Sequence, residues 1–150
     1  MRAVIQRVKY AKVIINKEVK ASIKDGLLIL LGVEHEDNKE DAEWLGKKIA
    51  RLRIFDDSSG VMNLDITQSG GEILVISQFT LHAKTKKGNR PSYIQAAAPV
   101  IAIPLYELFV KKIGEEAGTE VRTGEFGAEM EVELLNNGPV TIIVDTRNKE

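Results

Sequence analysis

The chain contains no cysteine and only two histidines among its 150 residues. The missing cysteines exclude disulfide bonds, thiolate metal sites and a cysteine nucleophile. The histidines, His35 and His82, do not form the closely spaced pair that is typical of zinc sites. A lone histidine is more often a satisfied core or surface residue than a ligand, so we expect neither a metal nor another cofactor.

Long apolar runs are missing too. The longest, Gly26 to Val33, has the length of a strand and is far shorter than the roughly 18 residues that a membrane-spanning helix requires. The first seven residues follow a strand pattern and lack the apolar segment and cleavage site of a signal peptide. These features predict a cytoplasmic protein without a membrane partner.

The chain has no excess of positive charge, since its net charge is -1 and its pI is near 6.2. It could therefore bind nucleic acid only through a local basic patch. Residues 84–90 offer one, with the cations Lys84, Lys86, Lys87 and Arg90. Charge alone leaves two interpretations open, a mobile loop that binds nucleic acid and a merely solvated loop.

What the chain does contain is a series of short segments rich in Val, Ile and Leu. They predict strands near residues 3–8, 12–15, 19–23, 27–33 and 72–77, of which 27–33 is apolar throughout and should be buried on both faces. Helical spacing predicts a helix from about Lys39 to Leu52 and a second from Pro99 to just before Gly118, although Pro104 weakens its first turn and a half. We expect one α+β domain over residues 1–150, with a curled or barrel-like, largely antiparallel sheet and two main helices packed on one face.

Near the end of the chain, Asn136 to Thr141 separates an alternating segment from an apolar run. Gly-Pro is a turn signal, so we predict a turn between two paired strands, a final hairpin. Only X-Pro bonds adopt the cis form at a modest cost, and a cis Gly138–Pro139 bond would aim two successive carbonyls the same way. From this segment alone, an ordinary hairpin turn is the commoner explanation.

Chemistry is suggested at the end of the strand 72–77. No G-x-S-x-G elbow and no glycine-rich phosphate loop is present. Ser77, Gln78 and Thr80 instead place small polar groups where a buried strand ends, a position suited to oriented backbone N–H donors that stabilise an oxyanion. Such residues also often just satisfy the neighbouring backbone.

Five motifs, in order, resemble the D-aminoacyl-tRNA deacylases. They are G-x-M-N-L at 60–64, S-Q-F-T-L-H-A at 77–83, G-N-R-P-S-Y at 88–93, T-G-x-F-G-A-x-M at 123–130 and N-N-G-P-V-T at 136–141. The sequence departs from the family at Val61, where a lysine is usual, at His82, often Tyr or Ala, and at Asn137, usually acidic. The resemblance spans essentially the whole chain.

The resemblance implies a homodimeric enzyme that hydrolyses the ester between a D-amino acid and the terminal adenosine of tRNA, and that also clears mischarged glycyl-tRNA. Ser77, Gln78, Phe79 and Thr80 would line the aminoacyl pocket, with Gln78, Phe79 and Thr80 as the catalytic group. The adenine would lie against Phe126, Gly127 and Met130. Gly138 and Pro139 would form a cis pair that enters the partner subunit's pocket and excludes L-amino acids, with Arg7 as its anchor.

The same family picture gives the proton-handling role to the 2′-hydroxyl of the terminal ribose and makes the backbone N–H groups near Phe79 and Thr80 the oxyanion donors. A nucleophilic Thr80 is disfavoured, because nothing obvious in the sequence would deprotonate its hydroxyl. Two alternatives stay open: an RNA-binding module without turnover, and an acyl hydrolase that acts on non-RNA esters.

Overall fold

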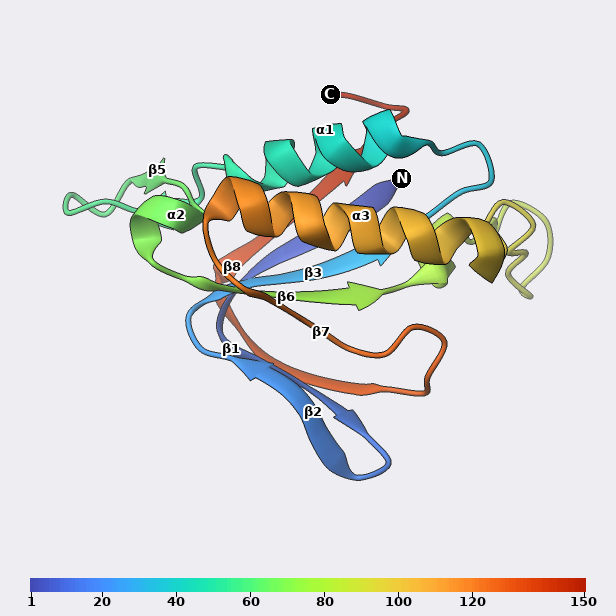
Figure 1. The fold of residues 1–150 in the computed structure, drawn as a ribbon, viewed down its shortest axis with the longest axis horizontal. Coiled ribbons are helices and arrows are strands. Elements are labelled where there is room, and N and C mark those ends of the chain that lie inside the picture. The colour runs from blue at the N-terminus through green and yellow to red at the C-terminus, as the bar shows by residue number, and fades with distance from the viewer.

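The computed structural model describes residues 1–150, and it begins with three consecutive strands, after which helices are inserted between the remaining strands (Figure 1). The strands are β1 (Arg2–Ile15), β2 (Glu18–Ile23), β3 (Gly26–Gly32), β4 (Phe55–Asp56), β5 (Met62–Leu64), β6 (Glu72–Ser77), β7 (Val121–Thr123) and β8 (Glu131–Asp145). The helices are α1 (Lys39–Ala50), α2 (Ile66–Ser69) and α3 (Pro99–Ala117), with a 3-10 turn, η1, at Phe79–His82.

The main sheet has the strand order β2-β1-β3-β6-β7, and β8 pairs with the other edge of β1. β1 is antiparallel to β2, β3 and β8, whereas β6 is parallel to both β3 and β7. The parallel pairs arise because α1 and α3 lie in the connections that precede β6 and β7, and helical crossovers return the chain in the same direction. The predicted curled, largely antiparallel sheet is therefore confirmed, with a parallel portion under the helices.

α1 and α3 cover one face of the sheet, as predicted (Figure 1). Asn38 caps α1 through a capping box with Asp41, and the helix ends at Ala50, two residues before the predicted end. α3 begins with Pro99 and ends at Ala117, and the cap residue Gly118 has φ 64°, the left-handed conformation that glycine adopts readily. Pro104 lies inside α3, but the helix is continuous through it.

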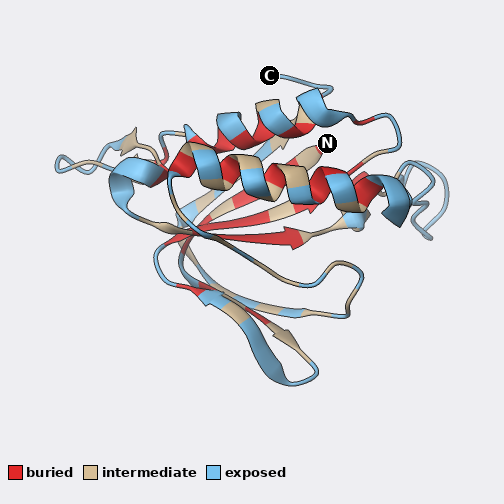
Figure 2. Cartoon of the chain, viewed as in Figure 1, coloured by how far each residue is buried: buried red, intermediate tan, exposed pale blue.

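The core has two parts because the sheet is buried on both sides in its middle. A large cluster includes Leu45 of α1, Phe109 of α3 and Ile29 of β3. Figure 2 shows buried residues on the sides of both helices that face the sheet. On the inner side of the curl, a smaller cluster includes Val13 and Leu28. β3 contributes to both clusters, which explains its unbroken apolar sequence.

The predicted hairpin at Asn136–Thr141 is wrong. β8 is one strand, and both of its halves pair antiparallel with β1. Thr141 pairs with Gln6 and Asn136 pairs with Val8, so residues 137–140 bulge out opposite the single residue Arg7. A hairpin would reverse the chain direction, whereas a bulge bends the strand and lets it continue. The Gly138–Pro139 bond within this bulge is cis, as predicted.

Met1, which precedes β1, contacts the segments that follow β3 and β8. Its ammonium group is fully buried, 2.6 Å from Asp37 Oδ1, and it donates a hydrogen bond to Thr146 Oγ1. The N–H of Thr146 in turn donates to the Met1 carbonyl at 2.9 Å. A buried ion pair thus joins the start of β1 to the segment between β3 and α1, and two hydrogen bonds join it to the segment that follows β8. None of the helices combines the length and the apolar character that crossing a membrane requires.

Candidate functional site

A cavity of about 260 Å³ opens at the carboxyl ends of β3 and β6. Its wall is formed by two segments that lie about fifty residues apart in the sequence, one following β6 and the other following β7. Most of the lining side chains are apolar. The lining residues are Leu31, Val33, Ile76, Ser77, Gln78, Phe79, Ala97, Ala102, Phe126, Gly127, Ala128, Met130 and Val132.

η1 forms one rim of this cavity. The Gln78 N–H donates to the Leu31 carbonyl at 2.8 Å, which fixes the point where the chain leaves β6. The next two N–H groups, of Phe79 and Thr80, stand at the start of this 3-10 turn, where N–H groups have no acceptor within the turn itself. The site thus holds two backbone donors beside an apolar cavity, which is the equipment for stabilising a developing oxyanion.

The Thr80 side chain lies next to the cavity but not among its lining residues. Its hydroxyl oxygen accepts a hydrogen bond from the Gln78 side-chain amide. An amide N–H donor cannot remove a proton, so this contact does not activate the hydroxyl. Phe79 is 56% exposed, and its ring meets the Tyr93 ring edge to face, 5.1 Å between centroids.

The opposite wall comes from the loop that joins β7 to β8. Gly127 has φ 79°, and a Cβ on Gly124 would lie 2.6 Å from Met130 Sδ, so this loop packs tightly on itself. Phe126 contacts Tyr106 edge to face at 5.8 Å. The Tyr106 hydroxyl donates to the Val75 carbonyl, and burial raises the Tyr106 pKa well above its ordinary value. The wall is therefore neutral and held from behind by α3.

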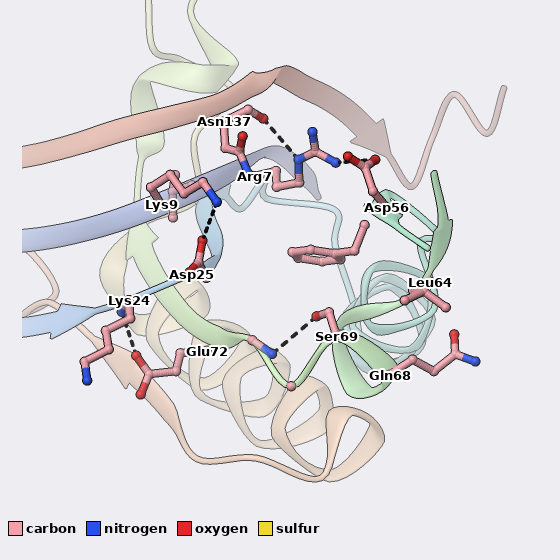
Figure 3. A pocket seen from close by; sticks show the side chains of 14 residues that line it. Arg7, Lys9, Lys24, Asp25, Asp56, Leu64, Gln68, Ser69, Glu72 and Asn137 are labelled. Carbon is pink, nitrogen blue, oxygen red and sulfur yellow. Dashed lines mark hydrogen bonds and ion pairs between the residues drawn. The ribbon is translucent and has the colours of Figure 1, made fainter. Parts of the chain in front are cut away.

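Arg7 lies against the bulge of β8 (Figure 3). It is 7% exposed, and it donates from Nε to the Asn137 carbonyl at 3.1 Å and from Nη1 to the Ile54 carbonyl at 2.7 Å. Asp56 Oδ1 lies 3.2 Å from the same Nη1. Gly138, next along the bulge, lies so close that a Cβ there would be 3.1 Å from Arg7 Nη2. The guanidinium thus ties the bulge to the loop that follows α1.

A second, mostly polar cavity of about 660 Å³ adjoins Arg7 and Asn137 (Figure 3). It lies at the other end of the strands from the first cavity, since its walls include Asp25 and Glu72, which stand at the starts of β3 and β6. Most of its charged side chains are already in ion pairs or hydrogen bonds with one another, such as Lys9 with Asp25.

Within one chain, the bulge and the first cavity are far apart. Val132, which lines the cavity, pairs with Val13, whereas the bulge faces Arg7, six residues away along β1. At about 3.3 Å per residue this separation is roughly 20 Å. The structure brings together Ser77, Gln78, Phe79, Phe126, Gly127 and Met130, with Thr80 alongside, but it leaves Gly138 and Pro139 at a distance.

The basic segment 84–90 and the two histidines lie outside this cavity. The cations at 84–90 are all exposed and follow η1 directly. His35 is exposed, while His82 is buried, with Nδ1 2.9 Å from Glu34 Oε1. No three or more histidine, aspartate or glutamate side chains are grouped so that they could hold a metal ion. Sequence reasoning missed the aliphatic lining residues, such as Ala97 and Ala102, because nothing distinguishes them from other core residues.

The chain is similar to known proteins over nearly its whole length. The family described as D-Tyr-tRNA(Tyr) deacylase matches residues 4–145. Relatives named D-aminoacyl-tRNA deacylase are 63% identical in Bacteroides thetaiotaomicron and 58% identical in Flavobacterium psychrophilum, each over 150 residues and the full length of both chains.

Solved structures are similar as well. One described as "c-Myc DNA Unwinding Element Binding Protein" has a TM-score of 0.90 and 36% identity, with 97% of this chain and 98% of that chain covered. A probable eukaryotic D-amino acid tRNA deacylase has a TM-score of 0.81 at 15% identity, with 95% and 97% covered, which shows a shared fold. By its sequence match over nearly its whole length, the chain belongs to the D-Tyr-tRNA(Tyr) deacylase family.

Proposed function

We propose that this protein hydrolyses the ester that joins a D-amino acid to the 3′-terminal adenosine of tRNA, releasing the free amino acid and tRNA. The observation that carries the proposal is the cavity in which residues 77–79 and 126–130 face each other. The first segment would hold the aminoacyl group and the second the adenine, for which an aromatic ring and a flexible methionine are suitable partners.

The chemistry needs few side chains because an aminoacyl ester is already activated. The N–H groups of Phe79 and Thr80 would donate to the oxygen on which negative charge develops as water attacks the carbonyl carbon. The 2′-hydroxyl of the terminal ribose would handle the proton. Positioning of the ester and one water beside these donors supplies the remaining rate enhancement.

Thr80→Ala should keep most of the deacylation rate, because the Thr80 hydroxyl accepts from Gln78 and has no base beside it. A D-aminoacyl-tRNA that lacks the terminal 2′-hydroxyl should, in contrast, be turned over poorly by the unaltered protein. Single-turnover rates for both substrates check this. A loss of about 10⁴-fold in Thr80→Ala, or a trapped acyl-enzyme, would instead establish covalent catalysis.

Selection against L-amino acids would act at the α-carbon, because a pocket that accepts varied D side chains cannot discriminate by fitting one of them. Main-chain carbonyls of Gly138 and Pro139 would occupy the space into which an L side chain projects. Hydrogen would be tolerated there, so glycyl-tRNA would also be a substrate. Since the bulge lies roughly 20 Å from the cavity of its own chain, it would enter the cavity of a second copy in a homodimer.

The basic loop would contact the tRNA backbone beside the cavity. Its four cations follow η1, so a tRNA whose terminal adenosine occupies the cavity passes within their reach. Each neutralised phosphate contributes about -0.7 to -0.9 to the slope of log K against log salt. Lys86→Ser/Lys87→Ser should therefore reduce the magnitude of that slope by about 1.4 to 1.8, measured by filter binding of tRNA between 50 and 200 mM salt. An unchanged slope would remove these lysines from the interface.

The decisive experiment for the activity uses matched D- and L-aminoacyl-tRNA and counts released amino acid. Release from the D-ester and not from the L-ester supports the proposal. Tight, salt-sensitive tRNA binding without release would favour a binding module. One similar structure is named as a DNA-binding protein, which is the reason to test this alternative. Hydrolysis of small D-amino acid esters that tRNA does not inhibit would favour an enzyme of non-RNA esters.

A further inference from the structure

η1 is too short to be stable without contacts to the rest of the protein. It has four residues, and short 3-10 turns have poor hydrogen-bond geometry and little stability of their own. Its start is fixed by the Gln78–Leu31 hydrogen bond. The orientation of the Phe79 and Thr80 N–H groups therefore depends on what holds its other end, at Leu81 and His82.

One support is Arg2, from the start of β1. Its Nη1 donates to the Leu81 carbonyl at 2.7 Å, while its Nε donates to Asp145 Oδ2 at 2.8 Å. Burial alone would raise the pKa of Asp145, but hydrogen bonds from the Arg147 N–H and from Arg2 hold it below its ordinary value. Asp145 is thus ionised at neutral pH and keeps the guanidinium fork aimed at η1.

The second support is His82 itself. The ring is 2% exposed, and it packs on β3 so closely that a Cβ on Gly32 would lie 2.8 Å from its Nε2. Nδ1 lies 2.9 Å from Glu34 Oε1, an ion-pair distance, although the contact is not aligned as a hydrogen bond. Arg147 Nε holds the other oxygen of the same carboxylate at 3.1 Å.

We propose that Arg2 and His82 are positioning residues that set the direction in which η1 presents the backbone N–H groups of Phe79 and Thr80 to the ester. Neither touches the cavity. Arg2 pairs with Asp145 at the end of β8, and His82 contacts Glu34, which follows β3. The ends of these two strands therefore determine the orientation of the N–H donors. This inference rests on the proposed deacylation and assigns residues to it.

Positioning of this kind affects the transition state more than substrate binding, because oxyanion donors interact most strongly with the charge that develops during the reaction. Displacement of a catalytic group by about 1 Å can cost 10²-fold in rate. Arg2→Met keeps the aliphatic stem and removes both donors. We expect kcat for D-tyrosyl-tRNA to fall about 10- to 100-fold while KM stays within about twofold.

The matched control is Arg51→Met, the same substitution at a different arginine. It removes a guanidinium that forms an ion pair with Glu116 of α3 at the surface. It should leave kcat and KM unchanged. His82→Leu, which fills the buried space without the nitrogens, should reproduce the fall in kcat. Asp145→Asn should lower kcat less, and it should add nothing in the Arg2→Met background, because Asp145 acts through Arg2.

The outcomes separate the two proposals. If the unaltered protein does not release D-tyrosine from tRNA, the proposed function fails. If it does, and folded Arg2→Met and His82→Leu proteins retain kcat within about twofold, or raise KM instead, the positioning role is overturned. Circular dichroism and thermal unfolding establish that each variant is folded, so a fall in kcat that only tracks the folded fraction also overturns it.

Discussion

Asp37→Ala is expected to lower the free energy of unfolding by about 3–5 kcal/mol, the usual cost of removing one partner from a buried ion pair. The Met1 ammonium and the Asp37 carboxylate have no exposed side-chain surface. Without the carboxylate, the ammonium would keep only the Thr146 hydroxyl as a partner. The Glu34 N–H, which donates to Asp37 Oδ2, would lose its acceptor as well.

Asp25→Ala is the matched control, because Asp25 also pairs with a cation, the Lys9 ammonium at 3.3 Å, but both side chains are more than half exposed. Exposed pairs contribute about 0–1 kcal/mol. Urea unfolding of both variants gives the comparison. A similar, small change in the two would mean that water enters the Met1 site and that the ion pair contributes little.

Arg7→Met should relax selectivity. Methionine retains the stem but loses the hydrogen bonds to the Asn137 and Ile54 carbonyls, each worth about 1.5–3 kcal/mol when the donor is charged. The bulge would then shift away from the position in which, under the proposed function, its carbonyls would exclude an L side chain. We expect the ratio of kcat/KM for D- over L-aminoacyl-tRNA to fall roughly 10- to 100-fold, about 1.4–2.8 kcal/mol.

The same substitution removes two such hydrogen bonds and should also lower the free energy of unfolding by about 3–6 kcal/mol, so selectivity is measured at a temperature where the variant is folded. Arg51→Met again serves as control and should leave the ratio unchanged. An Arg7→Met protein that is folded, dimeric by light scattering and as selective as the parent would refute the anchoring role while leaving the hydrolase proposal intact.

Local signals predicted local structure. The unbroken apolar stretch in β3, the Asn38 cap and the Pro99 and Gly118 limits of α3 each depend on residues within a few positions of one another. The hairpin failed for the opposite reason. Gly-Pro marks a turn and a bulge alike, and only the pairing of both halves of β8 with β1 distinguishes them. That pairing joins residues more than a hundred positions apart.

The same contrast between local and long-range signals applies to the candidate site. The polar residues after β6 could be recognised from the end of a buried strand, whereas the facing wall and the Arg7 contact were available only through family resemblance. Asp37, Arg2 and His82 look ordinary in the sequence. Their partners lie far away along the chain, at Met1, Asp145 and Glu34 respectively, so no short-range pattern identifies them.

The pairing of β1 with β8 also governs the order in which a newly made chain can fold. Asp145 follows its partner Arg2 by 143 positions, so at roughly 5–20 residues per second the ribosome delivers it roughly 7–29 s later. Until then, β1 can pair with β3 but has an unpaired edge along its other side, the kind of surface that promotes aggregation. The Arg2 guanidinium likewise has no Asp145 carboxylate to pair with until then. The strand made first is therefore completed by the strand made last, and the donors of η1 receive their final support only when translation of β8 ends.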